Sequence, residues 1–214
     1  MRPSISFLVT TSGIAPPVPT ATGPYRLDVL GVHRGQRTLY FLEHVVRGPG
    51  ERRDTAETPL LHVMHLSGEH AGRLATAVSW YQGRGDETPA EHDARLTDLC
   101  RDLTPLEPLA PDDWQLSTRV VQHRALRLPD GQPSIRKFAL SLQVDAIYHP
   151  VLDRSERQAG RTSVTAYLRP RANLDGVWGI PGEPLAVARV AYVGVPSDTG
   201  HEKHTAVLVR RSIN

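Results

Sequence analysis

The chain has 214 residues, with 25 Lys and Arg against 23 Asp and Glu and a formal net charge of +2. A chain of this length can bury a substantial hydrophobic core, while a charge this close to balance does not by itself call for an anionic partner. The one cysteine, Cys100, excludes an internal disulfide and a cysteine-based zinc site.

The sequence also predicts a soluble, cytoplasmic protein with no membrane partner. The N-terminal apolar run, residues 5–9, is shorter than a signal peptide requires, and no apolar stretch reaches the roughly 20 residues of a membrane span. No low-complexity linker divides the chain, which favours one domain over residues 1–214. The proline-rich stretch 104–111 is the clearest compositional break, so a subdivision there is the alternative.

The chain begins with a series of predicted strands. Alternating residues predict a strand over 4–11. Residues 25–33 and 37–46 predict two further strands, joined through Arg34-Gly35-Gln36 as a hairpin. The strand 37–46 is apolar on both faces, which is typical of a central strand. Residues 60–66 form a further apolar run that suits a strand covered on both faces.

Residues 68–103 predict two short helices. Ser67 can cap the first helix, because its hydroxyl can accept a hydrogen bond from a backbone N–H of the first turn. Apolar residues then follow at the spacing of one helical face: Ala71, Leu74, Ala75 and Val78.

The second helix has the clearest local signal in the chain. Thr88 and Glu91 form a capping box around Pro89, which suits the first helical position because its missing N–H would have been unpaired there. A buried stripe follows, made of Leu96, Leu99, Cys100 and Leu103. We therefore expect a helical hairpin, with Cys100 buried on its second helix and chemically inert.

Strands are predicted again after the helices. Residues 116–128 and 134–148 flank Pro129-Asp130-Gly131, whose residue types favour a turn. Apolar residues occupy even positions in both strands, so burying both sets on one face requires a loop with an odd number of residues, three or five. Three more strands are predicted over 162–168, 184–195 and 204–211.

These elements predict an α+β fold. It would be mostly antiparallel β-structure of about nine strands, arranged as a sandwich or open barrel, with the helical hairpin inserted near residues 68–103.

The histidines are the first candidate site. His62 and His65 form one H-x-x-H pair and His201 and His204 form a second, and four imidazoles could hold zinc, with Glu69 or Glu202 as general base of a hydrolase. Residues three apart on a strand point to opposite faces, however, so one metal could not bind both members of a pair without a bulge. Two unrelated pairs of partly buried histidines are the simpler interpretation.

A basic surface is the second candidate site. If the loop is odd, the outward face of the 116–148 hairpin presents four basic residues: Arg119, His123, Arg127 and Lys137. Such a face could bind phosphates or an acidic protein surface through charge. Gln143 and Asp145 dilute the patch, and it lacks the stacking aromatic residues that single-strand binders use.

Three functions are compatible with these patterns. We favour a non-catalytic binding or assembly protein that contacts an anionic partner, either nucleic acid or an acidic protein surface, or that self-assembles into an oligomer; it would need no cofactor. The first alternative is a hydrolase that depends on zinc bound by histidine. The second is a small-molecule binder with a pocket in the β-structure, for which Trp114, Trp178 and Tyr192 are candidate lining residues.

Overall fold

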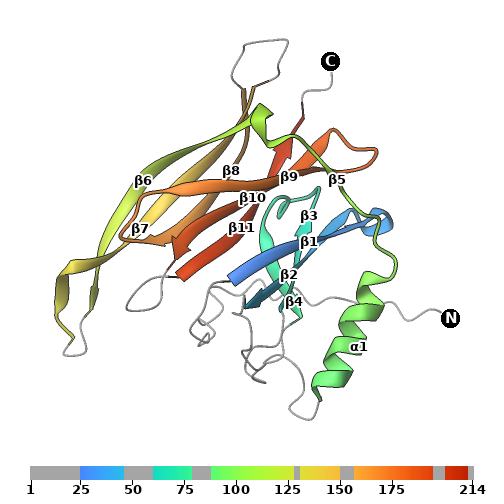
Figure 1. The fold of residues 1–214 in the computed structure, drawn as a ribbon, viewed down its shortest axis with the longest axis horizontal. Helices are drawn as coiled ribbons and strands as arrows, with labels where there is room; N and C mark the ends of the chain where they lie inside the picture. Colours follow the sequence, from blue (N-terminus) through green and yellow to red (C-terminus); the bar gives the residue numbers. More distant parts are fainter. Residues whose placement is uncertain are drawn as a thin grey trace.

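The computed structural model describes residues 25–45, 60–78, 88–127, 131–149, 157–194 and 201–211. Two antiparallel sheets and one α-helix, α1 (Pro89–Cys100), dominate these ranges (Figure 1). Strands account for 67% of the described residues and helices for 12%. No helix in these ranges is long and apolar enough to cross a membrane. The strand expected at 4–11 lies outside the described residues.

The smaller sheet is a four-stranded meander in which each strand pairs with the next along the chain. Its strands are β1 (Tyr25–His33), β2 (Thr38–Val45), β3 (Leu60–His65) and β4 (Leu74–Val78). A short 3-10 turn, Arg34–Gln36, joins β1 to β2, and the Nδ1 atom of His33 accepts a hydrogen bond from the Gln36 backbone N–H at 3.2 Å. The predicted hairpin at this position is therefore confirmed.

The larger sheet has seven strands in the order β5-β9-β10-β8-β7-β6, with β11 also paired to β10. Its strands are β5 (Glu107–Pro108), β6 (Trp114–Arg127), β7 (Pro133–Tyr148), β8 (Arg157–Tyr167), β9 (Ala172–Gly179), β10 (Leu185–Gly194) and β11 (His201–Arg210). β10 pairs with β9 and β11 along most of its length but meets β8 only where Gly194 pairs with Ala166. The sheet is therefore bent, and Figure 1 shows β6, β7 and β8 spreading away from β9, β10 and β11.

The predicted helical hairpin is wrong, because its first half is β4 and not a helix. Residues 66–72 form a turn in which Gly68 and Gly72 adopt positive φ angles of 91° and 76°, a conformation that interrupts a helix. The apolar residues assigned to one helical face lie on both faces of β4, with Leu74 against one core and Ala75 against another. The predicted α+β class with an inserted helical hairpin is therefore wrong: the described residues are mostly antiparallel β with one longer helix.

The second predicted helix is confirmed as α1. Thr88 Oγ1 accepts a hydrogen bond from the Glu91 backbone N–H at 3.3 Å, and the Glu91 carboxylate accepts one from the Thr88 backbone N–H at 2.7 Å. Leu96 of α1 is buried against Tyr40, Leu61 and Val63 of the four-stranded sheet. The local capping signal and the apolar stripe thus place this helix on the outer face of that sheet.

Three layers of hydrophobic packing result, and β10 lies between two of them. One core fills the bend of the seven-stranded sheet, the second lies between the two sheets, and the third lies under α1. Alternate residues of β10 face different cores, since Ala186, Ala188 and Val190 belong to the first and Val187 to the second. β10 is therefore covered on both faces.

The proline-rich stretch 104–111, at which the sequence allows a subdivision of the chain, forms backbone hydrogen bonds with both sheets. Thr104 exchanges two backbone hydrogen bonds of 2.9 Å with Val32 in β1. Three residues later β5 pairs with β9, with Glu107 opposite Gly179. The segment thus links the edge of the four-stranded sheet to the edge of the seven-stranded sheet.

The β6–β7 hairpin has the odd loop that the sequence predicts. Arg127 pairs with Pro133, which leaves the five residues 128–132 between them. In the half away from this loop, even-numbered residues pair with one another, as Leu116 does with Ala146 and Val120 with Leu142. The apolar alternation of both strands is therefore satisfied together there.

Gly160 in β8 allows two parts of the larger sheet to approach closely. A Cβ atom at this position would overlap the carbonyl oxygen of Leu208 in β11 and lie 2.9 Å from Cγ1 of Val209. Gly35, in contrast, could take a Cβ atom at 3.4 Å from its nearest neighbour, His33 Cε1, which is an ordinary contact. The packing of β8 on β11 thus depends on the missing side chain.

We expect Gly160→Ala to lower the free energy of unfolding by about 1–3 kcal/mol, because the added methyl group forces β8 away from β11. The matched variant Gly35→Ala should change it by no more than about 1 kcal/mol, in the stabilising direction. Urea denaturation of both variants measures the difference. Equal stability of Gly160→Ala and the wild type would contradict the close approach.

Candidate functional site

The basic residues of the β6–β7 hairpin are divided between its two faces. Arg119 pairs with Gln143, and its Nη2 atom donates a hydrogen bond to Gln143 Oε1 at 2.9 Å. The register then shifts between Val120 and Gln122, so Val121 is an extra, bulged residue. Past this bulge His123 pairs with Leu140, a core residue. His123 therefore lies on the opposite face of the hairpin from Arg119.

The remaining two residues of the predicted basic face lie nearer the loop. Lys137 precedes Phe138, whose ring lies 4.4 Å from the ring of His123, and strand alternation puts Lys137 on the other face from Phe138. Arg127 is exposed at the end of β6, opposite Pro133. The four residues thus belong to one hairpin and are spread along it, but they are not gathered on one face.

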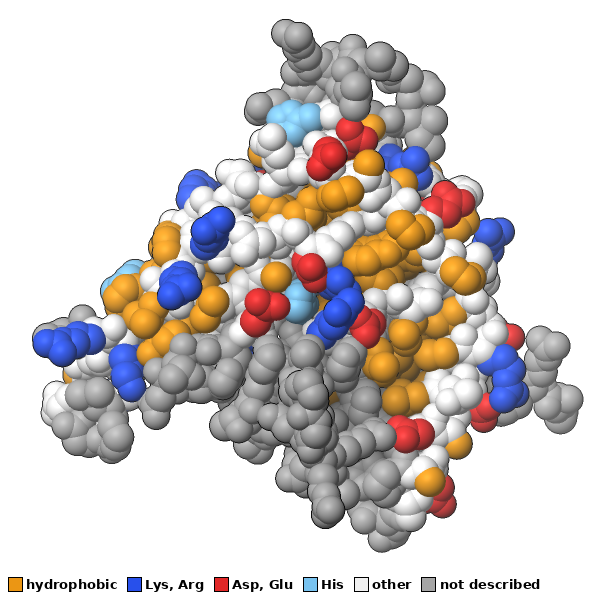
Figure 2. All heavy atoms as spheres, in the orientation of Figure 1, with side chains coloured by type: hydrophobic (Ala, Val, Ile, Leu, Met, Phe, Trp, Pro, Cys, Tyr) orange, Lys and Arg blue, Asp and Glu red, His pale blue; other side chains and the backbone are white. Residues whose placement is uncertain are grey.

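The centre of β6 is exposed over six consecutive residues, Arg119 to Arg124. Val120 and Val121 are 44% and 52% exposed, which is unusual for large apolar side chains in this fold. Figure 2 shows Lys and Arg side chains beside apolar ones in the part of the molecule where β6 and β7 lie. The surface therefore combines positive charge with accessible apolar area.

A second cluster of charged groups is buried between the two sheets, around Arg189 of β10. The Arg189 residue is only 6% exposed, and burying a guanidinium costs several kcal/mol unless it is paired and hydrogen-bonded. The neighbouring strands leave space for the Arg189 side chain, since Arg189 is paired with Ala206 of β11 and with Gly176 of β9. Both neighbours are small, which leaves room for the long side chain.

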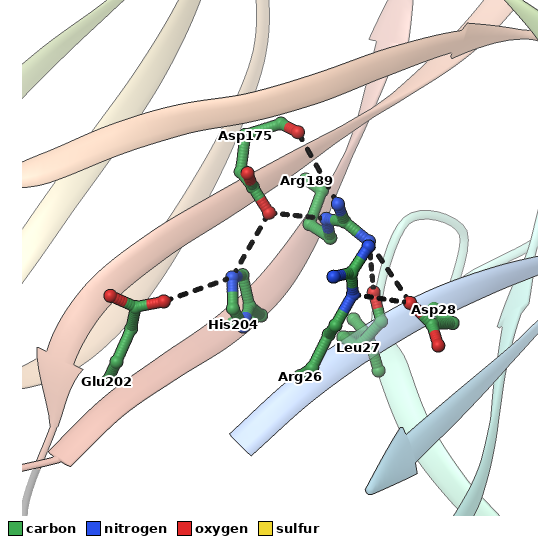
Figure 3. Close-up of polar contacts among 7 residues, drawn as sticks. All are labelled: Arg26, Leu27, Asp28, Asp175, Arg189, Glu202 and His204. Atoms are coloured by element: carbon green, nitrogen blue, oxygen red, sulfur yellow. Dashed lines mark hydrogen bonds and ion pairs between the residues drawn. The ribbon is translucent and has the colours of Figure 1, made fainter. Parts of the chain in front are cut away.

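Arg189 is surrounded by acceptors from β1 and β9 (Figure 3). Its Nε atom lies 2.8 Å from Asp175 Oδ2, as an ion pair in which the N–H is not aligned for a hydrogen bond. Its Nη1 atom donates to the Leu27 carbonyl at 3.0 Å and lies 3.4 Å from Asp28 Oδ1. The guanidinium also lies 5.1 Å from the centre of the Trp178 ring, a distance at which a cation–π interaction is favourable.

His204 extends this ion network along β11. Its Nε2 atom lies 3.1 Å from Asp175 Oδ2 and 3.8 Å from Glu202 Oε1, and its side chain is 6% exposed. The carboxylate of Asp175 is therefore shared between Arg189 and His204. Negative and positive groups alternate through the network, which connects β1, β9, β10 and β11 (Figure 3).

Glu43 and His62 form a related pair on the four-stranded sheet. His62 Nε2 lies 3.3 Å from Glu43 Oε2, and His62 Nδ1 lies 3.2 Å from Thr76 Oγ1. Burial alone would raise the pKa of Glu43, but the contact with His62 and the nearby charges of Lys203 and His204 outweigh it and hold the pKa below its ordinary value. The Glu43 carboxylate thus faces charged groups of the other sheet.

The same environment shifts the pKa values of two further groups. Burial lowers the pKa of Lys203, and the nearby Glu43 carboxylate, which acts in the opposite direction, does not compensate for it. Burial, followed by the charge of Glu43, raises the pKa of Tyr192 to about 12. Glu43 therefore interacts electrostatically with β11 from the four-stranded sheet.

The two H-x-x-H pairs are only partly brought together. His62 and His204 both lie near Glu43, whereas His65 points to the other face of β3, where its Nδ1 atom lies 3.0 Å from Thr38 Oγ1. The side chain of His201 lies outside the described residues. Within the part of the chain that is described, no three His, Cys, Asp or Glu side chains form a group that could hold a metal ion.

The aromatic residues considered for a small-molecule pocket do not line one cavity. Trp114 is buried in the first core with its ring 4.7 Å from that of Tyr148, and Tyr192 packs against the same core. Trp178 packs against the second core, on the opposite face of the sheet. Their positions are those of ordinary core residues.

Cys100 lies at the end of α1 and is half-buried. It borders a shallow groove of about 390 Å³ lined by Leu30, Leu42, Leu96, Thr97, Cys100 and Arg101. Burial raises the pKa of the thiol, which keeps it protonated and weakly reactive at neutral pH.

The ion network is the group that the sequence patterns missed. A signal for it exists, because Arg189 interrupts the apolar run Leu185–Val193 of a strand that is covered on both faces. A charged residue in such a run must find partners inside the protein. Sequence alone could not name those partners, since Asp28 comes from a distant part of the chain and Asp175 is brought to Arg189 by the pairing of β9 with β10.

We expect Arg189→Met to lower the free energy of unfolding by about 3 kcal/mol, because the change removes the buried cation that neutralises Asp175. Arg26 is a matched control, since it pairs with the same Asp28 carboxylate at 2.8 Å but is half exposed. Arg26→Met should cost less than about 1 kcal/mol. If a denaturant titration showed that Arg189→Met and Arg26→Met lower the free energy of unfolding equally, the buried guanidinium would not be more important than the exposed one.

We also expect Glu43 to make stability depend on pH in the acidic range. Its pKa is lower in the folded protein than its ordinary value of 4.5, so the stabilisation is present above that value and is lost as the pH falls through the folded pKa. Glu43→Gln should therefore flatten the fall of the unfolding free energy below about pH 4.5. Glu107 is exposed, so the control variant Glu107→Gln should show the same fall of the unfolding free energy with pH as the wild type.

Comparisons were made between this chain and protein-family models, curated proteins and solved structures. None of the three found a match. A function for the chain must therefore be inferred from its own residues, their exposure and their contacts.

Proposed function

We propose that the protein is a non-catalytic binding or assembly protein that contacts an anionic partner through the β6–β7 hairpin. One observation carries the proposal: the exposed centre of β6, Arg119 to Arg124, belongs to a strand that contains no acidic residue. A local excess of positive charge attracts an anionic surface at a distance and strengthens its binding.

The local balance of charge supports this proposal. β6 carries Arg119, His123, Arg124 and Arg127 without any Asp or Glu between Trp114 and Arg127. β7 adds Arg136 and Lys137, and its one acidic residue, Asp145, is paired with Arg161 of β8. The hairpin is therefore far more basic than the whole chain, whose net charge is only +2.

The buried ion network is a weaker candidate for the binding site. An anionic group that approached Arg189 would have to displace Asp175, Asp28 and the Leu27 carbonyl, which already surround the guanidinium. Breaking such contacts costs more than an exposed ion pair returns. The exposed arginines of β6 require no such displacement, which favours the hairpin as the surface for the partner.

The bulge at Val121 determines how a partner would meet these charges. Because Arg119 and His123 lie on opposite faces of the hairpin, a partner lying flat on one face would reach only part of the charge. A partner that approaches the edge of β6 would reach residues of both faces. The edge of the strand is thus the more favourable direction of approach.

We expect the double variant Arg119→Glu, Arg124→Glu to bind an immobilised polyanion, such as heparin resin, much more weakly than the wild type and to elute at lower salt, because both charges are reversed at the contact. Stability should change by no more than about 0.5 kcal/mol, since both residues are exposed. The elution salt concentration and a urea titration measure the two effects.

The matched control is Arg34→Glu, Arg73→Glu. Both residues are exposed and lie outside the hairpin, and the variant has the same net charge as the first. It should elute close to the wild type. Identical elution of the two double variants would show that net charge, and not the hairpin, determines binding.

A further inference from the structure

We infer that the anionic partner is an extended polypeptide segment with alternating acidic and apolar residues, and that it adds to the edge of β6 as a further strand. This inference rests on the proposed function and specifies its partner. It draws on three features of β6: an open edge, a division of side chains between the two faces, and a bulge at the centre of the exposed stretch.

β6 is the last strand of the seven-stranded sheet, and β7 pairs with it on one side only. In Figure 1 it runs along the margin of the molecule. At Thr118 the hydroxyl donates a hydrogen bond of 3.3 Å to the Pro170 carbonyl, so the other side of β6 is in contact with the chain there. From Arg119 onward, no strand among the described residues pairs with that side.

An open strand edge presents a row of backbone N–H and C=O groups that can pair with another strand. Recognition of peptides by strand addition uses these backbone groups for affinity and the side chains of alternate residues for specificity. The exposed stretch Arg119 to Arg124 is long enough, because strands of about five or six residues are the common length.

The register shows which side chains an added strand would meet. Arg119, Gln122 and Arg124 pair with Gln143, Ser141 and Ala139 and share one face. Val120, His123 and Ala125 pair with Leu142, Leu140 and Phe138 and share the other face. One face of the β6 edge is therefore cationic and the other is largely apolar.

A complementary strand has the opposite arrangement. Side chains alternate between faces along a strand, so acidic residues at every second position would face Arg119 and Arg124, and apolar residues between them would face Val120. Opposite charges on neighbouring strands are stabilising, and so are paired β-branched residues. The 44% exposure of Val120 is then an unfilled apolar contact.

Two other occupants fit this edge less well. Nucleic acid would use the arginines but not the exposed valines, and binders of single strands usually supply aromatic rings for stacking, whereas the aromatic residue of β6, Trp114, is 6% exposed. A second copy of the chain, paired antiparallel around Val121 and Gln122, would place Arg119 opposite Arg124. Like charges directly opposite one another are destabilising.

Val121 allows the backbone of the edge to be changed with little effect on the sheet. As the bulged residue it has no partner on β7, and proline is tolerated at bulges and on edge strands. Val121→Pro removes one backbone N–H, whereas the control Val121→Thr keeps both the N–H and a β-branched side chain.

The experiment measures the fluorescence anisotropy of labelled probes mixed with the full chain. The main probe is an alternating glutamate–valine peptide of about ten residues. The other probes are the same peptide with N-methyl groups on alternate backbone amides, polyglutamate of equal length, and single-stranded DNA of about 20 nucleotides. We expect the main probe to bind most tightly, with N-methylation and Val121→Pro each weakening it by about tenfold and Val121→Thr leaving it unchanged.

The outcomes separate this inference from the proposed function. Equal binding of the N-methylated and unmodified peptides, or tighter binding of the DNA, overturns strand addition while the hairpin remains an anion-binding surface. Self-association that Val121→Pro abolishes, measured by sedimentation, makes a second copy the occupant and also overturns it. If no probe binds and the variants at Arg119 and Arg124 elute from the polyanion like the wild type, both proposals fail.

Discussion

Arg189 sets the position of the two sheets relative to each other, because its guanidinium can be stabilised only where β1, β9 and β10 meet. β10 contributes alternate residues to two hydrophobic cores, so any charged residue on it is removed from water. The acceptors come from both sheets, the Leu27 carbonyl and Asp28 from one and Asp175 from the other. Hydrophobic contact between two sheets permits some sliding, whereas hydrogen bonds and ion pairs require particular distances. The network therefore specifies one alignment among those that apolar packing would allow.

The sequence predicts those elements whose signals are local. The capping box of Thr88 and Glu91 marks α1 correctly, and the turn residues between β6 and β7 mark a hairpin with an odd loop. Sequence alone does not identify β4, because a short segment with apolar residues toward both sides, here Leu74, Ala75, Ala77 and Val78, fits a helical spacing and a strand equally well. The strand is formed because β4 pairs with the edge of β3 that β2 does not cover, and because Gly68 and Gly72 adopt positive φ angles that interrupt a helix. The edge is a tertiary feature, and no pattern within residues 71–78 reports it.

The candidate sites show the same limit. Alternation correctly separates His62 from His65, but the approach of His62 and His204 to Glu43 depends on how the two sheets stack. For the basic hairpin, the parity argument holds from Trp114 to Val120 and fails after the bulge at Val121. Glycine marks some bulges, but here the extra residue is the second of two valines. A one-residue insertion without a sequence signal therefore moves His123 to the face opposite Arg119.

The bulge and the buried network together explain why a nearly neutral chain carries a basic surface. Five carboxylates elsewhere in the described ranges lie beside arginines: Asp28 and Asp175 beside Arg189, Glu183 beside Arg37, Asp98 beside Arg101 and Asp145 beside Arg161. These pairs cancel charge within the molecule. β6 has arginines but no acidic residue of its own, and the bulge turns successive polar groups toward both faces and the edge. Because charges interact most strongly within about 10 Å at moderate salt, a partner responds to this local excess and not to the net charge of +2.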